Sequence, residues 1–114
     1  MKTCLFLDDL RKVEDVIDSI NFDCILTLRS YKEAVTYMEM FGCPNIIYFD
    51  HDLGKEKTGY DLAKWIVNKD LDEDFIPEDF EFHVHSANPI GRENIEKLLG
   101  MYLKHKEEFM EKQK

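Results

Sequence analysis

Two kinds of hydrophobic period alternate along the 114-residue chain. Four short stretches rich in apolar and β-branched residues have the length and composition of buried strands: residues 3–7 (TCLFL), 24–28 (CILTL), 45–49 (NIIYF) and 81–85 (EFHVH). Between and after them, apolar residues recur every three or four positions, which predicts amphipathic helices around Val13, Val16, Ile17 and Ile20; Ala34, Val35, Met38 and Phe41; Leu62, Ala63, Ile66 and Val67; and Ile95, Leu98, Leu99, Tyr102 and Leu103. The predicted order of elements is βαβαβαβα.

Capping signals mark the boundaries of the later helices. Residues suited to accept hydrogen bonds from the first helical amides stand at three predicted helix starts: Ser30 with Glu33, Thr58 with Asp61, and Asn88 followed by Pro89. Gly42 and Pro44 are expected to end the second helix. Apolar strands that alternate with helices indicate a parallel sheet joined by right-handed crossovers. The predicted fold class is therefore α/β, a three-layer sandwich around a four-stranded parallel sheet.

The bulk properties restrict the possible functions. We expect a single domain over residues 1–114, with a charged helical tail from about residue 104. The formal net charge of -9, from 24 acidic and 15 basic residues, disfavours general DNA binding, because phosphate contacts need clustered Lys and Arg. No stretch approaches the length of a membrane span, and the start MKTCLFLDDL reaches carboxylates too early for a signal peptide, so we expect a cytoplasmic protein without membrane contact.

Cysteines and the densest acidic run are assigned to structure. Cys4, Cys24 and Cys43 are odd in number and have no C-x-x-C spacing, which favours reduced, structural thiols over disulfides or a zinc site. Residues 70–81, DLDEDFIPEDFE, are predicted to form a solvated loop.

Polar residues gather where the predicted strands end, which is where ligands bind in open α/β sheets. The first strand is followed by Asp8, Asp9 and Arg11, the third by Asp50, His51 and Asp52, and the fourth by His85, Ser86 and Asn88. The end of the second strand offers Arg29 and Ser30, which we assign to structure.

A divalent cation is the expected partner of the carboxylates. If the first and third strands are neighbours, Asp8, Asp9 and Asp50 converge, and their charges repel unless a cation or protons intervene. Mg²⁺ is typically held by one or two carboxylates together with substrate phosphate oxygens, and Mn²⁺ accepts the same ligands. For single residues other roles stay open: Asp8 or Asp9 could cap the first helix, and Asp52 could form a turn.

The histidines divide into two groups. His51 and His85 stand at strand ends beside carboxylates, where an imidazole can transfer a proton near pH 7. His83 within the fourth strand is expected to be packed or half-exposed, and His105 to face solvent.

Near the last helix, Arg92 either pairs with Glu96 on the surface or helps to bind an anion.

The strand-end residues resemble those of response-regulator receiver domains. In that family an acid pair after the first strand binds Mg²⁺, an acid after the third accepts a phosphoryl group, and a hydroxyl follows the fourth. Asp8 and Asp9, Asp50, and Ser86 match these positions. Receivers also have a fifth strand ending in a Lys and a fifth helix, for which too few residues follow here. The resemblance implies a truncated receiver of flavodoxin-like topology with sheet order 2-1-3-4.

A closer resemblance covers nearly the whole chain. The stretches LFLDDLR, SYKEA, YFDHDLG, TGYDLAKWI and VHSANPIGRENI are similar to the motifs of the cyclic-phosphate processing receiver domain family. A proline that is common shortly after DDLR in that family is absent, and Lys12 and Val13 stand there instead. The resemblance implies a metal-assisted phosphoesterase that acts on a small nucleotide or RNA end carrying a cyclic phosphate.

The implied site divides the strand-end residues into three roles. The metal ligands would be Asp8, Asp9 and Asp50; His51 and His85 would be general acid and base, with Asp52 orienting one imidazole; and the phosphate or its sugar would be bound by Arg11, Ser86, Asn88 and Arg92. Two alternatives stay open: a signalling module with Asp50 as phosphoryl acceptor, and a protein that sequesters a cyclic nucleotide without turnover. The sequence names neither the substrate nor the oligomeric state.

Overall fold

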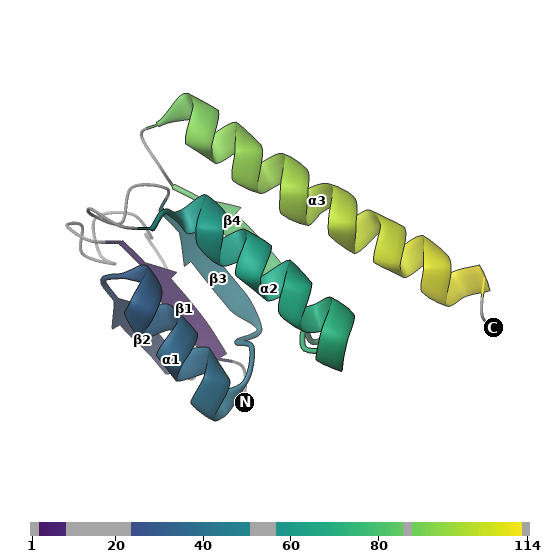
Figure 1. Cartoon of the computed structure of the whole chain (residues 1–114), viewed down its shortest axis with the longest axis horizontal. Helices are drawn as coiled ribbons and strands as arrows, with labels where there is room; N and C mark the ends of the chain where they lie inside the picture. The colour runs from purple at the N-terminus through teal and green to yellow at the C-terminus, as the bar shows by residue number, and fades with distance from the viewer. Residues whose placement is uncertain (1–2, 9–23, 51–56, 86–87, 113–114) are drawn as a thin grey trace.

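The computed structural model describes residues 3–8, 24–50, 57–85 and 88–112, without the side chains of 24, 25 and 108–112. Figure 1 shows the elements in this order: β1 (Thr3–Leu7), β2 (Cys24–Leu28), α1 (Tyr31–Phe41), β3 (Ile46–Phe49), α2 (Gly59–Glu73), β4 (Glu81–Val84) and α3 (Pro89–Lys112). The helix predicted around Val13 to Ile20 lies outside the described residues.

The four strands form one parallel sheet in the order β2-β1-β3-β4. Each strand lies beside its neighbour in the predicted order, so the predicted fold class and the sheet order 2-1-3-4 are confirmed. The strand bounds match the hydrophobic pattern closely. The only differences are that β3 begins one residue later and β4 ends one residue earlier than expected. The carboxyl ends of all four strands therefore meet at one edge of the sheet.

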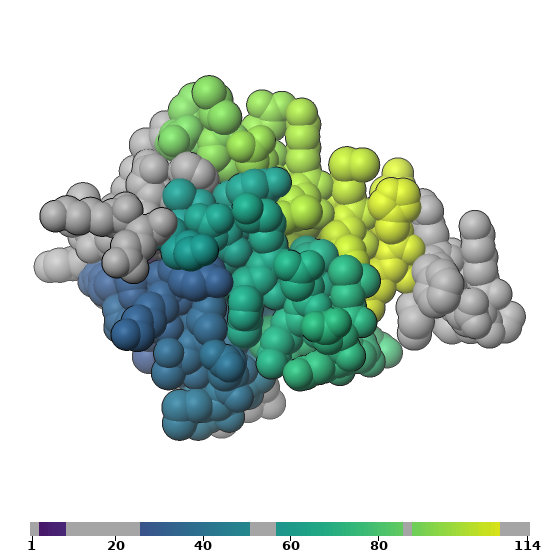
Figure 2. Space-filling view, in the orientation of Figure 1, coloured from purple at the N-terminus to yellow at the C-terminus, as the bar shows by residue number. Residues whose placement is uncertain are grey.

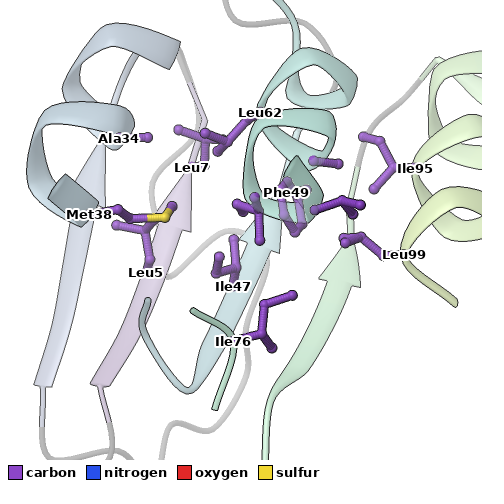
Figure 3. Close-up of a cluster of buried hydrophobic side chains, with 13 residues drawn as sticks. Leu5, Leu7, Ala34, Met38, Ile47, Phe49, Leu62, Ile76, Ile95 and Leu99 are labelled. Atoms are coloured by element: carbon purple, nitrogen blue, oxygen red, sulfur yellow. The ribbon is translucent and has the colours of Figure 1, made fainter. Parts of the chain in front are cut away.

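The main hydrophobic core lies between one face of the sheet and the three described helices (Figure 3). Alternate residues of the two central strands are fully buried there: Leu5 and Leu7 of β1, and Ile47 and Phe49 of β3. The helices contribute Ala34 and Met38, Leu62, Ala63, Ile66 and Val67, and Ile95 and Leu99. Burial of each large apolar side chain contributes about 1.5–3 kcal/mol. In α1, α2 and α3, these buried residues belong to the helical periods seen in the sequence, so those periods mark the faces that pack on the sheet. In the space-filling view of Figure 2, α1, α2 and α3 cover much of the face turned to the reader.

The predicted caps set the helix boundaries. Ser30 Oγ accepts from the Glu33 amide at 3.2 Å before α1. Thr58 and Asp61 form a reciprocal capping box at the start of α2. Gly42 ends α1 with φ of 90°, a left-handed value that favours glycine, and its amide donates to the Met38 carbonyl.

The acidic run of residues 70–81 is not simply a solvated loop, and that prediction was wrong. Helix α2 continues through Glu73, and Asp70 in its last turn is only 5% exposed. Asp74 then ends the helix in the left-handed region with φ of 55°. The charge pattern was misleading because the partners of Asp70 come from α3, which lies more than 30 residues further along the chain.

The thiols with described side chains have structural surroundings, as predicted. Cys4 is buried and Cys43 is partly buried. Burial raises the pKa of the Cys43 thiol to about 12, with a further contribution from the charge of Asp70, so this sulfur stays protonated and unreactive at neutral pH.

None of the helices that the structure describes has the length and hydropathy needed to cross a membrane.

Candidate functional site

Two buried carboxylates occupy equivalent positions at the carboxyl end of the sheet. Asp8 follows β1 and is 1% exposed, and Asp50 follows β3 and is 8% exposed. The two strands are paired with Phe6 opposite Tyr48, and each aspartate lies two residues further along its strand. Because side chains alternate between faces, both carboxylates belong to the sheet face opposite the main core.

The imidazole of His85 reaches across the sheet to Asp8. His85 Nε2 lies 3.0 Å from Asp8 Oδ2, and the ring stacks on Phe6 with centroids 4.8 Å apart and planes inclined by 1°. His85 follows β4, whereas Asp8 and Phe6 belong to the β1 side, so the ring spans the width of β3 between them. The side chain of His85 is only 8% exposed, and a hydrogen bond in such a shielded place is stronger than one in water.

This geometry gives the imidazole a fixed orientation. One ring nitrogen faces a carboxylate and the ring plane stacks on Phe6, and an imidazole held in this way is a suitable proton-transfer group. The sequence assigned Asp52 to orient one of the two imidazoles, and the carboxylate that the structure places beside His85 is Asp8. A carboxylate has two oxygens and several lone pairs, so this contact is compatible with the predicted role of Asp8 as a metal ligand.

Arg29, which the sequence placed at the end of the second strand and assigned to structure, also belongs to this end of the sheet. Its guanidinium donates from Nη1 to the main-chain oxygen of Asp8 at 3.0 Å, and the Asp8 amide donates to the Leu28 carbonyl at 3.2 Å. The segment that carries Asp8 is therefore fixed from the β2 side. In the sheet order β2-β1-β3-β4, a residue directly after β2 lies beside the end of β1.

The predicted substrate-binding residues Asn88 and Arg92 have structural partners at the start of α3. Asn88 Oδ1 accepts from the Gly91 amide at 3.0 Å, as expected of an N-cap. Arg92 Nε donates to Glu96 at 3.1 Å, and both side chains are about half exposed. Of the two roles that the sequence left open for Arg92, the structure displays the surface pair.

A row of rings lies on the same sheet face as these carboxylates, two residues nearer the amino ends of the strands. Phe6 of β1, Tyr48 of β3 and His83 of β4 are matched in register. The Phe6 and Tyr48 centroids are 6.4 Å apart, and His83 stacks on Tyr48 at 4.9 Å with planes inclined by 23°. Burial raises the pKa of Tyr48, and nearby Cys4 and Glu81 add to the shift. We call Phe6, Tyr48 and His83 the ring row, and Asp8, Asp50 and His85 the polar row.

The polar row offers the donor atoms that a hard divalent cation needs. Two buried carboxylates on neighbouring strands fit Mg²⁺ or Mn²⁺, which bind carboxylate oxygen. The described ranges 3–8, 24–50, 57–85 and 88–112 contain no group of three or more His, Cys, Asp or Glu side chains placed to hold a metal. The third expected ligand, Asp9, lies outside these ranges, as do four other predicted site residues: Arg11, His51, Asp52 and Ser86.

A second polar cluster lies between α2 and α3, and the sequence did not reveal it. The Asp70 carboxylate accepts from Tyr102 Oη at 2.5 Å, from the Ile76 amide at 2.7 Å and from Lys106 Nζ at 2.9 Å. Burial alone would raise the pKa of Asp70, but these hydrogen bonds and the charge of Lys106 lower it below its ordinary value. We call Asp70, Tyr102 and Lys106 the helix cluster.

The sheet order, the buried acids after β1 and β3, and the edge strand β4 define a receiver-like α/β domain. Comparison with known families identifies it more closely, since the model of the cyclic-phosphate processing receiver domain matches residues 3–101. The chain therefore belongs to that family. A search of curated protein sequences found no match.

Solved structures with the same fold include the Mn²⁺-bound form of the response regulator Rcp1. That structure has a TM-score of 0.58 and 17% sequence identity, and the alignment covers 91% of each chain. A fusion that contains the yeast Spc42 trimeric coiled coil aligns with a TM-score of 0.60 and 16% identity, over 96% of this chain and 81% of the other. At such low identity these similarities concern the fold alone.

Proposed function

We propose that this chain is a divalent-metal-dependent phosphoesterase that opens the cyclic phosphate of a nucleotide or an RNA end. The observation that carries the proposal is the buried pair of His85 and Asp8 beside Asp50, at the edge of the sheet where α/β proteins bind ligands. A proton-transfer group and metal-binding oxygens then share one small site. Membership of a cyclic-phosphate processing family supports the class of substrate.

Three aspartates are the proposed ligands of Mg²⁺ or Mn²⁺. Asp8 and Asp50 supply two buried carboxylates from neighbouring strands, and Asp9 is the third candidate. The similar fold of Rcp1, which was solved with Mn²⁺ bound, is in keeping with this choice of ion. When bound, the ion would neutralise negative charge on the phosphate and make its phosphorus easier to attack.

Proton transfer falls to the two strand-end histidines. A water oxygen attacks phosphorus, one P–O bond of the ring breaks, and the departing oxygen takes a proton, which yields a phosphomonoester. His85 and His51 are the proposed general acid and base. Since Asp8 already faces His85, Asp52 is left to orient His51. The remaining candidates would bind the phosphate or its sugar: Arg11, Ser86, Asn88 and Arg92.

The direct test is turnover by the purified full chain. It is incubated with Mg²⁺ or Mn²⁺ and a panel of 2′,3′-cyclic nucleotides, 3′,5′-cyclic nucleotides and RNA oligonucleotides with cyclic-phosphate ends, and the products are followed by ³¹P NMR. We expect a phosphomonoester in the presence of metal and none after chelation. If every member of the panel stays intact with both ions, the proposal is wrong.

A second candidate function rests on Asp50 itself. An aspartate buried at the end of β3 in a receiver fold occupies the position of a phosphoryl acceptor. Incubation with acetyl phosphate and Mg²⁺ separates the two functions by intact mass. A stable gain of one phosphoryl group that Asp50→Asn abolishes, without turnover of cyclic phosphates, would favour the signalling role.

A further inference from the structure

The ring row continues the proposed phosphate site along the same face of the sheet. His83 and His85 lie two residues apart on β4, and Tyr48 and Asp50 have the same spacing along β3. Since a strand rises about 3.3 Å per residue, the backbone positions of the ring row lie roughly 7 Å from those of the polar row. A nucleotide whose phosphate occupies the polar row would carry its base toward the rings.

His83 presents an exposed ring surface at the end of this row. Tyr48 stacks on one face of the imidazole at 4.9 Å, and the Glu81 carboxylate lies 3.4 Å from Nε2 at its edge. The side chain is nevertheless 53% exposed, and β4 is the edge strand of the described sheet. The exposed surface therefore includes the ring face turned away from Tyr48, at the position that the next ring of the row would occupy.

From this placement we propose that Tyr48 and His83 form a stacking platform for the nucleobase of the substrate. The inference rests on the proposed function and names the part of the substrate that the polar row does not bind. A planar base fits better than a peptide or a sugar, because it continues the stack of His83 on Tyr48, whose ring centroids are 4.9 Å apart. Every base has a π-face, so the platform binds all four bases and selects nucleotides over base-free cyclic phosphates.

The test compares two substrates that share the cyclic phosphate but differ in the base. Adenosine 2′,3′-cyclic phosphate carries a base, and glycerol 1,2-cyclic phosphate has none. We expect His83→Ala to raise KM for the adenosine substrate by about five- to tenfold with little change in kcat, because stacking contributes equally to ground state and transition state. The same variant leaves the glycerol substrate unaffected. His83→Phe, which keeps a ring, restores the KM.

A matched control replaces a histidine elsewhere on the surface. His105 is an exposed residue of α3, and His105→Ala is expected to change neither substrate. The platform is overturned if His83→Ala affects both substrates equally, which would indicate a structural role, or if it affects neither.

A binding measurement keeps this inference separate from the enzymatic proposal. The fluorescence of 2-aminopurine riboside monophosphate is quenched when its base stacks, so the wild-type chain should quench it and His83→Ala should not. If the chain hydrolyses nothing but quenches through His83, the platform holds and the esterase proposal fails. Turnover without quenching, or quenching unchanged by His83→Ala, overturns the platform.

Discussion

The polar row and the helix cluster each bury an aspartate, yet their surroundings differ. In the helix cluster, a tyrosine hydroxyl, a main-chain amide and an ammonium group all donate to Asp70, so its negative charge is compensated within the fold. In the polar row, two carboxylates share one end of the sheet, and the Asp8 carboxylate faces the imidazole of His85. Like charges held together are costly without a cation or protons. The helix cluster is therefore suited to stabilising the fold, whereas the polar row is suited to the metal and phosphate binding proposed above.

The largest expected effect comes from Asp8→Asn. This isosteric change removes one proposed metal ligand and the charge that faces His85, so kcat/KM for cyclic phosphates should fall ~10³-fold, equivalent to about 4 kcal/mol. Stability to urea should stay the same or rise, because one of two neighbouring carboxylates is neutralised. Asp72→Asn, an exposed aspartate of α2, serves as the control for both measurements. Unchanged turnover by Asp8→Asn would contradict the functional role of the polar row.

The matched change in the helix cluster is Asp70→Asn, which should lower stability and leave turnover unchanged. Breaking a fully buried ion pair costs about 3–5 kcal/mol, and we expect about 2 kcal/mol here because Lys106 keeps 27% of its side chain exposed. The loss is measured as the free energy of unfolding in urea. Turnover per folded molecule should not change. If Asp70→Asn lowers kcat while stability is retained, the two clusters do not divide stability and function in this way.

The pH dependence of stability tests whether the charges of Asp70 and Lys106 stabilise the helix cluster. The folded chain holds the pKa of Asp70 below its ordinary value of 3.8, so the stabilisation is present above that value and is lost as the pH falls through the folded pKa. Lys106 has a pKa raised above 10.5 by Asp70 and Asp74, so its contribution is present below that value and is lost as the pH rises through the folded pKa.

Urea unfolding of wild type and Asp70→Asn over the pH range tests both directions. The difference in stability between the two proteins should be largest between about pH 5 and pH 10 and should shrink at both extremes. A difference that stays constant down to about pH 2 would show that the carboxylate charge of Asp70 is not the source of the stabilisation.

The sequence predicts those parts of the molecule whose causes are local. The strands at residues 3–7 and 24–28 have the predicted bounds, and the caps at Ser30 and Thr58 accept from residues three positions away. Asp8, Asp50 and His85 could be singled out because each follows a strand, and parallel strands end at one edge.

Contacts between distant residues could not be predicted in the same way. His85 and Asp8 are 77 residues apart, and Asp70 and Tyr102 are 32 apart, so both pairs depend on how the elements are ordered in space. His83 was expected to be a packed or half-exposed strand residue, and its exposure agrees with that expectation. The stack on Tyr48 follows only from the register of β3 and β4.

The smallest expected effect is that of Thr58→Ala, which alters a third type of aspartate environment. Asp61 lies in the first turn of α2, where its carboxylate accepts from the Thr58 amide at 2.9 Å and its own amide donates to Thr58 Oγ1 at 3.2 Å. The hydrogen bond from the Thr58 amide is the main cause that lowers the pKa of Asp61. Thr58→Ala removes only the hydroxyl half of this capping box and should cost about 1 kcal/mol in urea unfolding.

Thr58→Ser is the matched variant, because it keeps the hydroxyl and should retain most of that stability. The loss is smaller than for Asp70→Asn because the capping box is partly exposed and joins residues of a single turn, whereas the helix cluster joins two helices. A loss from Thr58→Ala as large as that from Asp70→Asn would mean that the start of α2, rather than its contact with α3, limits the stability of the fold.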